Sequence, residues 1–140
     1  GQLEKSGGVA TNIGIHFFDL LIWIFGAVQK NTLQISEKNK AAGVLELENA
    51  RVRWFLSLDD QDLPDGLLEK GQRTYRSIKV DGEEIEFSGG FTDLHTVSYQ
   101  KILAGKGYGL ADARTSIEVV HHLRNTGPKG LKGDYHPMLK

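Results

Sequence analysis

The sequence contains no cysteine, and long apolar runs and an excess of charge of either sign are also absent. Without cysteine, the chain forms no disulfide bond, no cysteine-ligated zinc site and no thiol nucleophile, and this composition fits a cytoplasmic location. No stretch of 18 apolar residues is present, so we expect no membrane-spanning helix. Lys and Arg number 17 against 18 Asp and Glu. A nucleic-acid-binding module usually carries a basic excess, so we expect no nucleic-acid partner.

An initiating methionine is also missing, because the single methionine is Met138. We interpret Gly1 as a cut, a processing site or a boundary, and the 140 residues as part of a longer protein. Apolar residues make up 39% and charged residues 25% of the chain. This composition is sufficient for one domain with a hydrophobic core.

The most apolar stretch covers residues 13–27 and is predicted to be a buried helix that is covered on most of its faces. Gly26 is expected to end this helix, and Thr11 or Asn12 to cap its N-terminus. A loop is expected before it, at residues 6–8.

After residue 29 the apolar residues alternate with polar ones, which predicts β-strands. Hairpins are expected at Asn49-Ala50 and at Asp81-Gly82. Together these segments predict a sheet of about five antiparallel strands with one apolar face and one polar or interfacial face. Two helices are expected to follow, at residues 94–104 and 111–124. The predicted fold is therefore α+β, with an open, mainly antiparallel sheet and helices packed on one face.

Each of these two helices has its own expected features. Asp93 or Thr92 is expected to cap the first, after a break at residues 88–90. The second is expected to present a stripe of Ile117, Val120 and Leu123.

Asn12 and His16 are the main candidates for a functional site. They are four residues apart, so a helix places them on the same face, with Asp19 close by. Gly14 lies between them without a side chain and is expected to leave room for a ligand or for another backbone. A histidine in this position can exchange protons near neutral pH. The alternative interpretation is structural, with Asn12 as a helix cap and His16 as a core residue bonded to Asp19.

Other motifs offer weaker signals. His121 and His122 point about 100° apart on a helix, so no metal site is predicted. The glycine-rich loop at 105–109 lacks the ending of a phosphate loop and is interpreted as a connector. No G-x-G-x-x-G follows a strand, so the chain has no fingerprint for a dinucleotide. The tail at 129–140 is expected to be extended. It is interpreted as a solvated or packed terminus, and the alternative is a strand or flap that reaches a site or a neighbouring subunit.

Gly7-Gly8, followed by the segment from Asn12 to Asp19, resembles the opening of the C-terminal domain in the glucose–fructose oxidoreductase/inositol dehydrogenase/rhizopine catabolism family. Members carry Asp-x-Gly-x-His-x-x-Asp on a helix that faces the nicotinamide. This chain has Asn12 in place of the aspartate. Several stretches are similar to the branch of UDP-N-acetyl-2-amino-2-deoxyglucuronate dehydrogenases of lipopolysaccharide biosynthesis: Thr11-Asn12-Ile13-Gly14, Asp93-Leu94-His95-Thr96, Asp112-Ala113-Arg114 and Gly133-Asp134-Tyr135-His136-Pro137.

The resemblance implies that residues 1–140 form the substrate-binding and oligomerisation domain of a two-domain dehydrogenase, whose Rossmann domain for NAD is missing. It further implies that His16 is the catalytic acid/base, and that Asn12 and Thr11 bind the substrate. The implied reaction is oxidation of the C3 hydroxyl of UDP-N-acetylglucosaminuronic acid in O-antigen biosynthesis. The implied assembly is a homodimer or homotetramer through the open sheet face. The alternative is a non-catalytic scaffold or assembly domain of the same fold.

Overall fold

The structure is a computed structural model that describes residues 7–89 and 92–139. The chain divides into two compact units. We call residues 1–59 and 109–140 the sheet unit, and residues 60–108 the hairpin–helix unit. Each unit is described by itself.

The sheet unit opens with a helix that begins at Gly8 and ends at Phe25. Its first part contains a π-helical segment, η1 (Ala10–Gly14), and the rest is α2 (Ile15–Phe25). Gly26 ends the helix as predicted, with a φ of 88° and its N–H bonded to the carbonyl of Ile22 at 2.9 Å. A positive φ of this kind favours glycine, which has no Cβ to clash.

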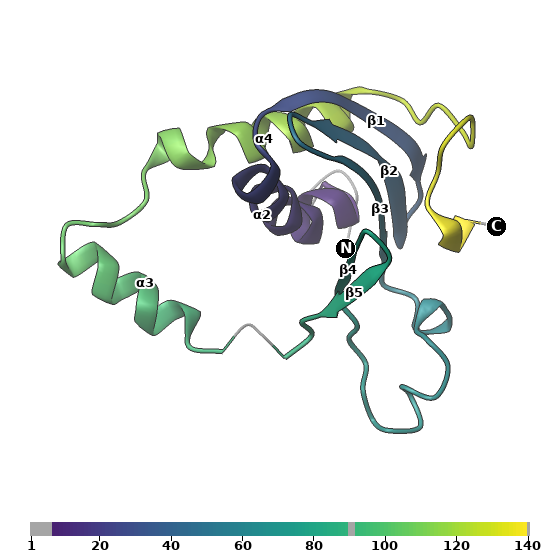
Figure 1. Cartoon of the computed structure of the whole chain (residues 1–140), viewed down its shortest axis with the longest axis horizontal. Coiled ribbons are helices and arrows are strands. Elements are labelled where there is room, and N and C mark those ends of the chain that lie inside the picture. Colours follow the sequence, from purple (N-terminus) through teal and green to yellow (C-terminus); the bar gives the residue numbers. More distant parts are fainter. Residues whose placement is uncertain (1–6, 90–91, 140) are drawn as a thin grey trace. The chain divides into compact units, whose positions relative to one another are not determined.

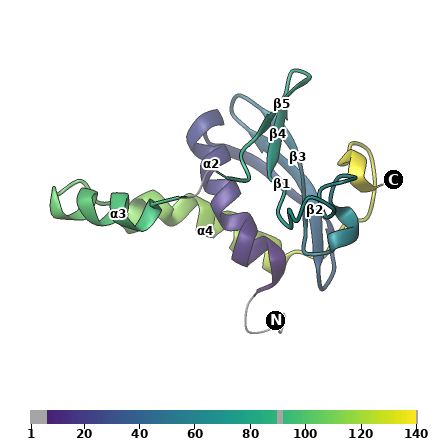
Figure 2. The same ribbon diagram turned by 90° about the horizontal axis from the view of Figure 1, so that it is seen from below.

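Three antiparallel strands follow in the order β1-β2-β3: β1 (Val28–Ser36), β2 (Lys40–Leu47) and β3 (Arg51–Ser57). The chain then returns from the hairpin–helix unit to form α4 (Leu110–Asn125). Figures 1 and 2 show α2 and α4 on one side of the sheet and the C-terminal segment on the other. That segment ends in a short 3-10 turn, η3 (Pro137–Leu139). Because the helices lie on one side and the tail on the other, both faces of the sheet are covered at least in part.

The core of the sheet unit lies between α2 and the sheet. Phe18 is 1% exposed, and its ring packs edge-on against Trp54 with the centroids 5.2 Å apart. Gly43 is the cross-strand partner of Trp54, and a Cβ there would lie 2.7 Å from the indole ring. Glycine at position 43 therefore lets the tryptophan lie flat on the middle strand.

The hairpin–helix unit contains η2 (Asp60–Asp62), β4 (Ser77–Val80), β5 (Glu83–Glu86) and α3 (Leu94–Leu103). β4 and β5 form an antiparallel hairpin through Asp81 and Gly82, whose φ values are 50° and 90°. Two consecutive positive φ values are typical of the tight turn that Asp-Gly favours. None of the described residues of this unit is buried.

The predicted α+β class, the antiparallel strands and the two hairpins are confirmed. The prediction of one sheet of about five strands is wrong, because β4 and β5 form a separate two-stranded sheet. Alternation identifies strands but not their partners. Residue 6 of the predicted N-terminal loop and residue 90 of the predicted break at 88–90 lie outside the described residues.

Four expectations about the helices also need correction. The first helix is not covered on most faces, since Trp23 is 84% and Ile24 48% exposed. The expected stripe on α4 is rotated, because Ile117 is exposed while Val119 is buried with Val120 and Leu123. Neither the first helix nor α3 has a side-chain cap at its N-terminus. The apolar pattern reports hydrophobicity, and it does not show which apolar face has a partner within the chain.

Candidate functional site

The first helix presents an exposed polar stripe formed by Asn12, His16 and Asp19. Asn12 lies in the π-helical segment and His16 in the first turn of α2. Residues spaced by four and then three positions share one side of a helix, so the three side chains face outward together. Trp23 continues the stripe one turn further on, and it is 84% exposed.

The structural alternative for this stripe is wrong in both of its parts. The helix begins at Gly8, upstream of Asn12, so Asn12 is not its cap. His16 is exposed, and among the described residues no hydrogen bond joins it to Asp19. Both Asn12 and His16 are therefore accessible to a molecule outside the chain.

Of the two roles expected for Gly14, the structure supports close approach of another part of the chain and not room for a ligand. Gly14 is buried, and a Cβ on it would lie 2.9 Å from Leu56 of β3 and 2.9 Å from the ring of Phe18. The missing side chain lets the helix approach the sheet, and it leaves no room for a ligand. Gly14 thus allows the helix to pack closely on the sheet, on the side opposite to the polar stripe.

Thr11 is half-buried, and its hydroxyl donates a hydrogen bond of 2.9 Å to the carbonyl of Gly7. This bond closes the first turn of the helix. The oxygen of Thr11 keeps lone pairs that can accept from a ligand.

The π-helical segment lies where the candidate residues are. A π turn closes over five residues instead of four, and such turns in proteins occur frequently at functional sites. No pattern in the sequence predicts a π-helical segment at these residues. The stripe offers an imidazole and an amide, and each of these groups can both donate and accept hydrogen bonds. Among the described residues, no group of three or more His, Asp or Glu could hold a metal ion.

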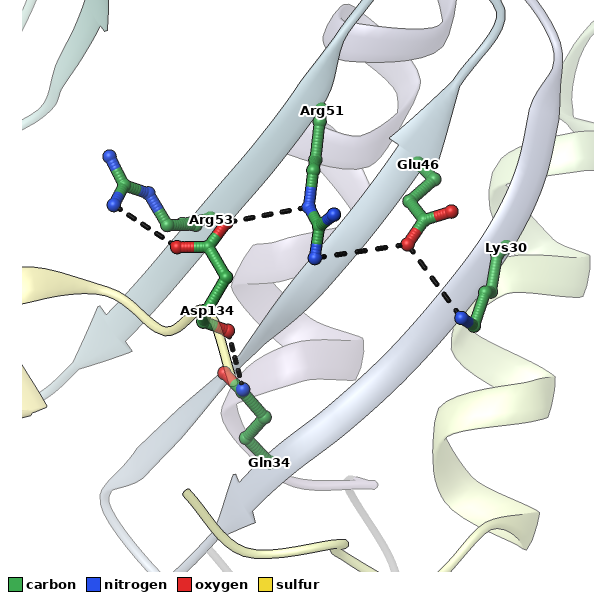
Figure 3. A network of polar contacts seen from close by, with 6 residues as sticks. All are labelled: Lys30, Gln34, Glu46, Arg51, Arg53 and Asp134. Carbon is green, nitrogen blue, oxygen red and sulfur yellow. Dashed lines mark hydrogen bonds and ion pairs between the residues drawn. The ribbon is translucent and has the colours of Figure 1, made fainter. Parts of the chain in front are cut away.

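A second polar cluster lies on the opposite face of the sheet (Figure 3). Asp134 of the tail accepts from Arg53 at 3.2 Å and pairs with Arg51 at 3.4 Å. Its backbone carbonyl accepts from the amide of Gln34 at 2.8 Å. Glu46 extends the network to Arg51 at 4.0 Å and to Lys30 at 3.8 Å. The tail is therefore a packed terminus on the outer face of the sheet, one of the two possibilities left open by the sequence.

His136 anchors the same tail. Its ring stacks on Phe55 with the centroids 5.7 Å apart, and its Nδ1 accepts a hydrogen bond of 3.2 Å from the backbone N–H of Met138. Burial, and then the positive charge of Arg53, hold the pKa of His136 below its ordinary value. The sequence showed an aspartate and a histidine in the tail, but not which strand residues they would meet.

A groove of about 600 Å³ between β1 and α4 was not expected from the sequence. Its lining includes Lys30, Asn31, His122 and Lys129. The amide of Asn31 donates to the carbonyl of Val119 at 3.2 Å, while its Oδ1 is buried without a partner. Within the described part of the chain, no helix is long and apolar enough to cross a membrane.

The first part of the chain matches the model of a known family. Residues 1–64 match the description "Oxidoreductase family, C-terminal alpha/beta domain". The match covers η1, α2, the three strands and η2, and it therefore includes the whole exposed stripe.

Two solved structures are similar to nearly the whole chain. The WlbA (WbpB) dehydrogenase from Thermus thermophilus in complex with NAD and alpha-ketoglutarate is 54% identical, with a TM-score of 0.90. The same dehydrogenase in complex with NAD and UDP-GlcNAcA gives 52% identity and a TM-score of 0.89. In both cases the match covers 96% of this chain and 44% of the other, so this chain spans less than half the length of these similar proteins.

Proposed function

Since the chain belongs to the glucose–fructose oxidoreductase/inositol dehydrogenase/rhizopine catabolism family of oxidoreductases, we propose that it forms the substrate-side half of an NAD-dependent nucleotide-sugar dehydrogenase. The observation that carries the proposal is the exposed pair of Asn12 and His16 on one side of the first helix. The scaffold alternative gives no reason for an exposed histidine on so apolar a helix.

In this proposal His16 acts as the acid/base. As the substrate hydroxyl is oxidised to a ketone, its proton passes to a ring nitrogen of His16, and in the reverse direction the same nitrogen returns it. Asn12 cannot take this proton, because an amide is not a base at neutral pH. Asn12 instead donates to and accepts from sugar hydroxyls, and the oxygen of Thr11 accepts a further hydrogen bond.

NAD, when bound, accepts the hydride that leaves the same carbon. This chain is suited to act beside a separate domain that binds NAD, because its polar stripe is exposed and it has no glycine-rich dinucleotide fingerprint. We assign binding of NAD to a Rossmann domain that docks on the side of the first helix where His16 lies.

The proposed substrate is UDP-N-acetylglucosaminuronic acid, oxidised at C3, and this rests on the similarity to a dehydrogenase solved with UDP-GlcNAcA. The proposed setting is lipopolysaccharide O-antigen biosynthesis in the cytoplasm. We further propose a homodimer or homotetramer that forms through the outer face of the β1–β3 sheet.

The proposal is tested in the longer protein that carries both domains, by following reduction of NAD with UDP-N-acetylglucosaminuronic acid. His16→Ala is expected to lower kcat by about 10²- to 10⁴-fold, the usual contribution of a general acid/base. His121→Ala is the matched control, because His121 is an exposed histidine on α4 and its side chain has no role in the proposal.

If His16→Ala keeps the turnover of the unmodified protein, His16 is not the acid/base. If the unmodified two-domain protein shows no dehydrogenase activity with any UDP-sugar, the scaffold function replaces the enzymatic one. Circular dichroism of both variants separates loss of catalysis from loss of fold.

A further inference from the structure

Gly14 lies on the inner side of the first helix, within the part that carries the polar stripe. A Cβ at this position would lie 2.9 Å from Leu56 and 2.9 Å from the ring of Phe18, whereas ordinary contacts of a Cβ begin at 3.4 Å. A methyl group would therefore need about 0.5 Å of additional room. The ring of Phe18 has little freedom to provide this room, because it is 1% exposed and packs edge-on against Trp54. A side chain at position 14 is thus expected to push the helix away from β3.

The π turn determines which residues of the helix face the sheet. The buried residues follow one another at spacings of five, four and three positions: Val9, Gly14, Phe18 and Leu21. In a regular α-helix, residues five positions apart point about 140° away from each other. The i→i+5 bonding of η1 instead brings Val9 and Gly14 to the same side. Gly14 is the last residue of η1, and η1 contacts β3, so the π turn is completed where the helix packs on the sheet.

The same turn sets the direction of the polar residues. Asn12 lies within η1 and His16 lies beyond it in α2, so the angle between their side chains depends on the π turn. If η1 became a regular α-helical turn, the residues before it would rotate by about 100° relative to α2. A catalytic group works only within about 0.5 Å and 10–20° of its productive geometry. The displacement and the rotation that Gly14 prevents both reach or exceed these limits.

We propose that Gly14 is a positioning residue for the proposed reaction. It holds the π turn and the first helix against β3, and this packing fixes the angle at which Asn12 and His16 face the substrate. The inference rests on the proposed function, because Gly14 acts through His16 and touches no substrate itself. Alanine forms helices more readily than glycine, so a loss of activity in Gly14→Ala does not come from a weaker helix.

The test measures kcat and KM of Gly14→Ala in the longer protein that carries both domains, by reduction of NAD with UDP-N-acetylglucosaminuronic acid. We expect kcat to fall by about 10- to 10²-fold, and by more than KM rises, because small displacements of a catalytic group have effects of this size. When His16 is already replaced by alanine, we expect Gly14→Ala to change kcat by less than about twofold. Two substitutions that act through one group are not additive.

Val44→Ala is the matched control for a general loss of packing. Val44 is 3% exposed, and its cross-strand partner is Arg53, whose side chain lies on the outer face of the sheet. The substitution therefore removes buried volume on the side away from the first helix, and we expect it to leave kcat unchanged. Thermal unfolding of each variant shows that the protein assayed is folded.

Two results would overturn the proposal. An unchanged kcat in Gly14→Ala means that the helix keeps its position without glycine. An equal loss of kcat with and without His16 means that Gly14 supports the fold in general. If Gly14→Ala does not fold, Leu56→Phe places the extra volume on β3 instead, and the same two comparisons decide. Failure of the proposed function is a separate result, because His16→Ala alone then keeps full turnover.

Discussion

The two units of this chain use similar secondary structure but different sources of stability. The sheet unit has a buried core in which Phe18 packs edge-on against Trp54. In the same core, Gly43 lets the ring of Trp54 lie close to the backbone of the middle strand. The hairpin–helix unit has a well-formed turn at Asp81-Gly82 and a regular helix, but no described residue of it is buried. Local propensity is therefore sufficient to define elements, whereas burial decides which of them stand without a partner.

The same difference applies to function. The exposed stripe with His16 lies on a helix whose opposite side is fixed by Gly14, Phe18 and Leu56, so the candidate residues are held on a rigid element. A site on a rigid element keeps its geometry without a ligand. The exposed apolar residues of α3 have no such support within their own unit.

The largest expected effect that separates the units concerns aromatic side chains. Phe18→Ala removes a ring that is 1% exposed, and we expect the free energy of unfolding to fall by about 3 to 5 kcal/mol. Tyr99→Ala on α3 removes a ring that is 68% exposed, and we expect a change within about 0.5 kcal/mol. Urea denaturation at low protein concentration measures both. Equal losses in the two variants would contradict the contrast between the units.

A smaller effect is expected from glycine. In Gly43→Ala the new methyl group meets the backbone carbonyl of Thr32 and the ring of Trp54, so we expect a loss of about 1 to 3 kcal/mol. Gly89→Ala in the hairpin–helix unit meets nothing within 4 Å, so we expect almost no change. Thermal unfolding monitored by tryptophan fluorescence reports both variants. A neutral Gly43→Ala would mean that the strands shift to accept the methyl group, and that the core is less tightly packed than described.

Much of this comparison could be predicted from the sequence, but only at the level of single elements. The alternation around Trp54 and the Asp81-Gly82 pair identify strands and turns, because these signals are local. The pairing of strands into two sheets is not local, and neither is the attachment of Asp134 to Arg51 and Arg53. The polar stripe was found because Asn12 and His16 are one turn apart, whereas the burial of Gly14 depends on a strand more than 40 residues away.

The smallest expected effects are two responses to pH, one from each unit. In the sheet unit the pKa of His136 is lowered, chiefly by burial and then by Arg53. The folded state therefore favours the neutral ring, and this stability is present above the ordinary histidine pKa of about 6.5. It is lost as the pH falls from that value through the lower folded-state pKa.

In the hairpin–helix unit the pKa of Glu84 is lowered, chiefly because the hydroxyl of Tyr75 donates a hydrogen bond of 2.6 Å to its carboxylate. The stability from this bond is present above the ordinary carboxyl pKa and is lost at more acidic pH than the contribution of His136. Amide exchange across a pH series should thus show the tail around His136 opening first and the hairpin opening at lower pH. His136→Phe keeps an aromatic ring on Phe55 but cannot be protonated, so it should remove the first transition and leave the second unchanged. If the first transition persists in His136→Phe, another group controls the tail, and the contrast in pH response between the two units no longer rests on His136.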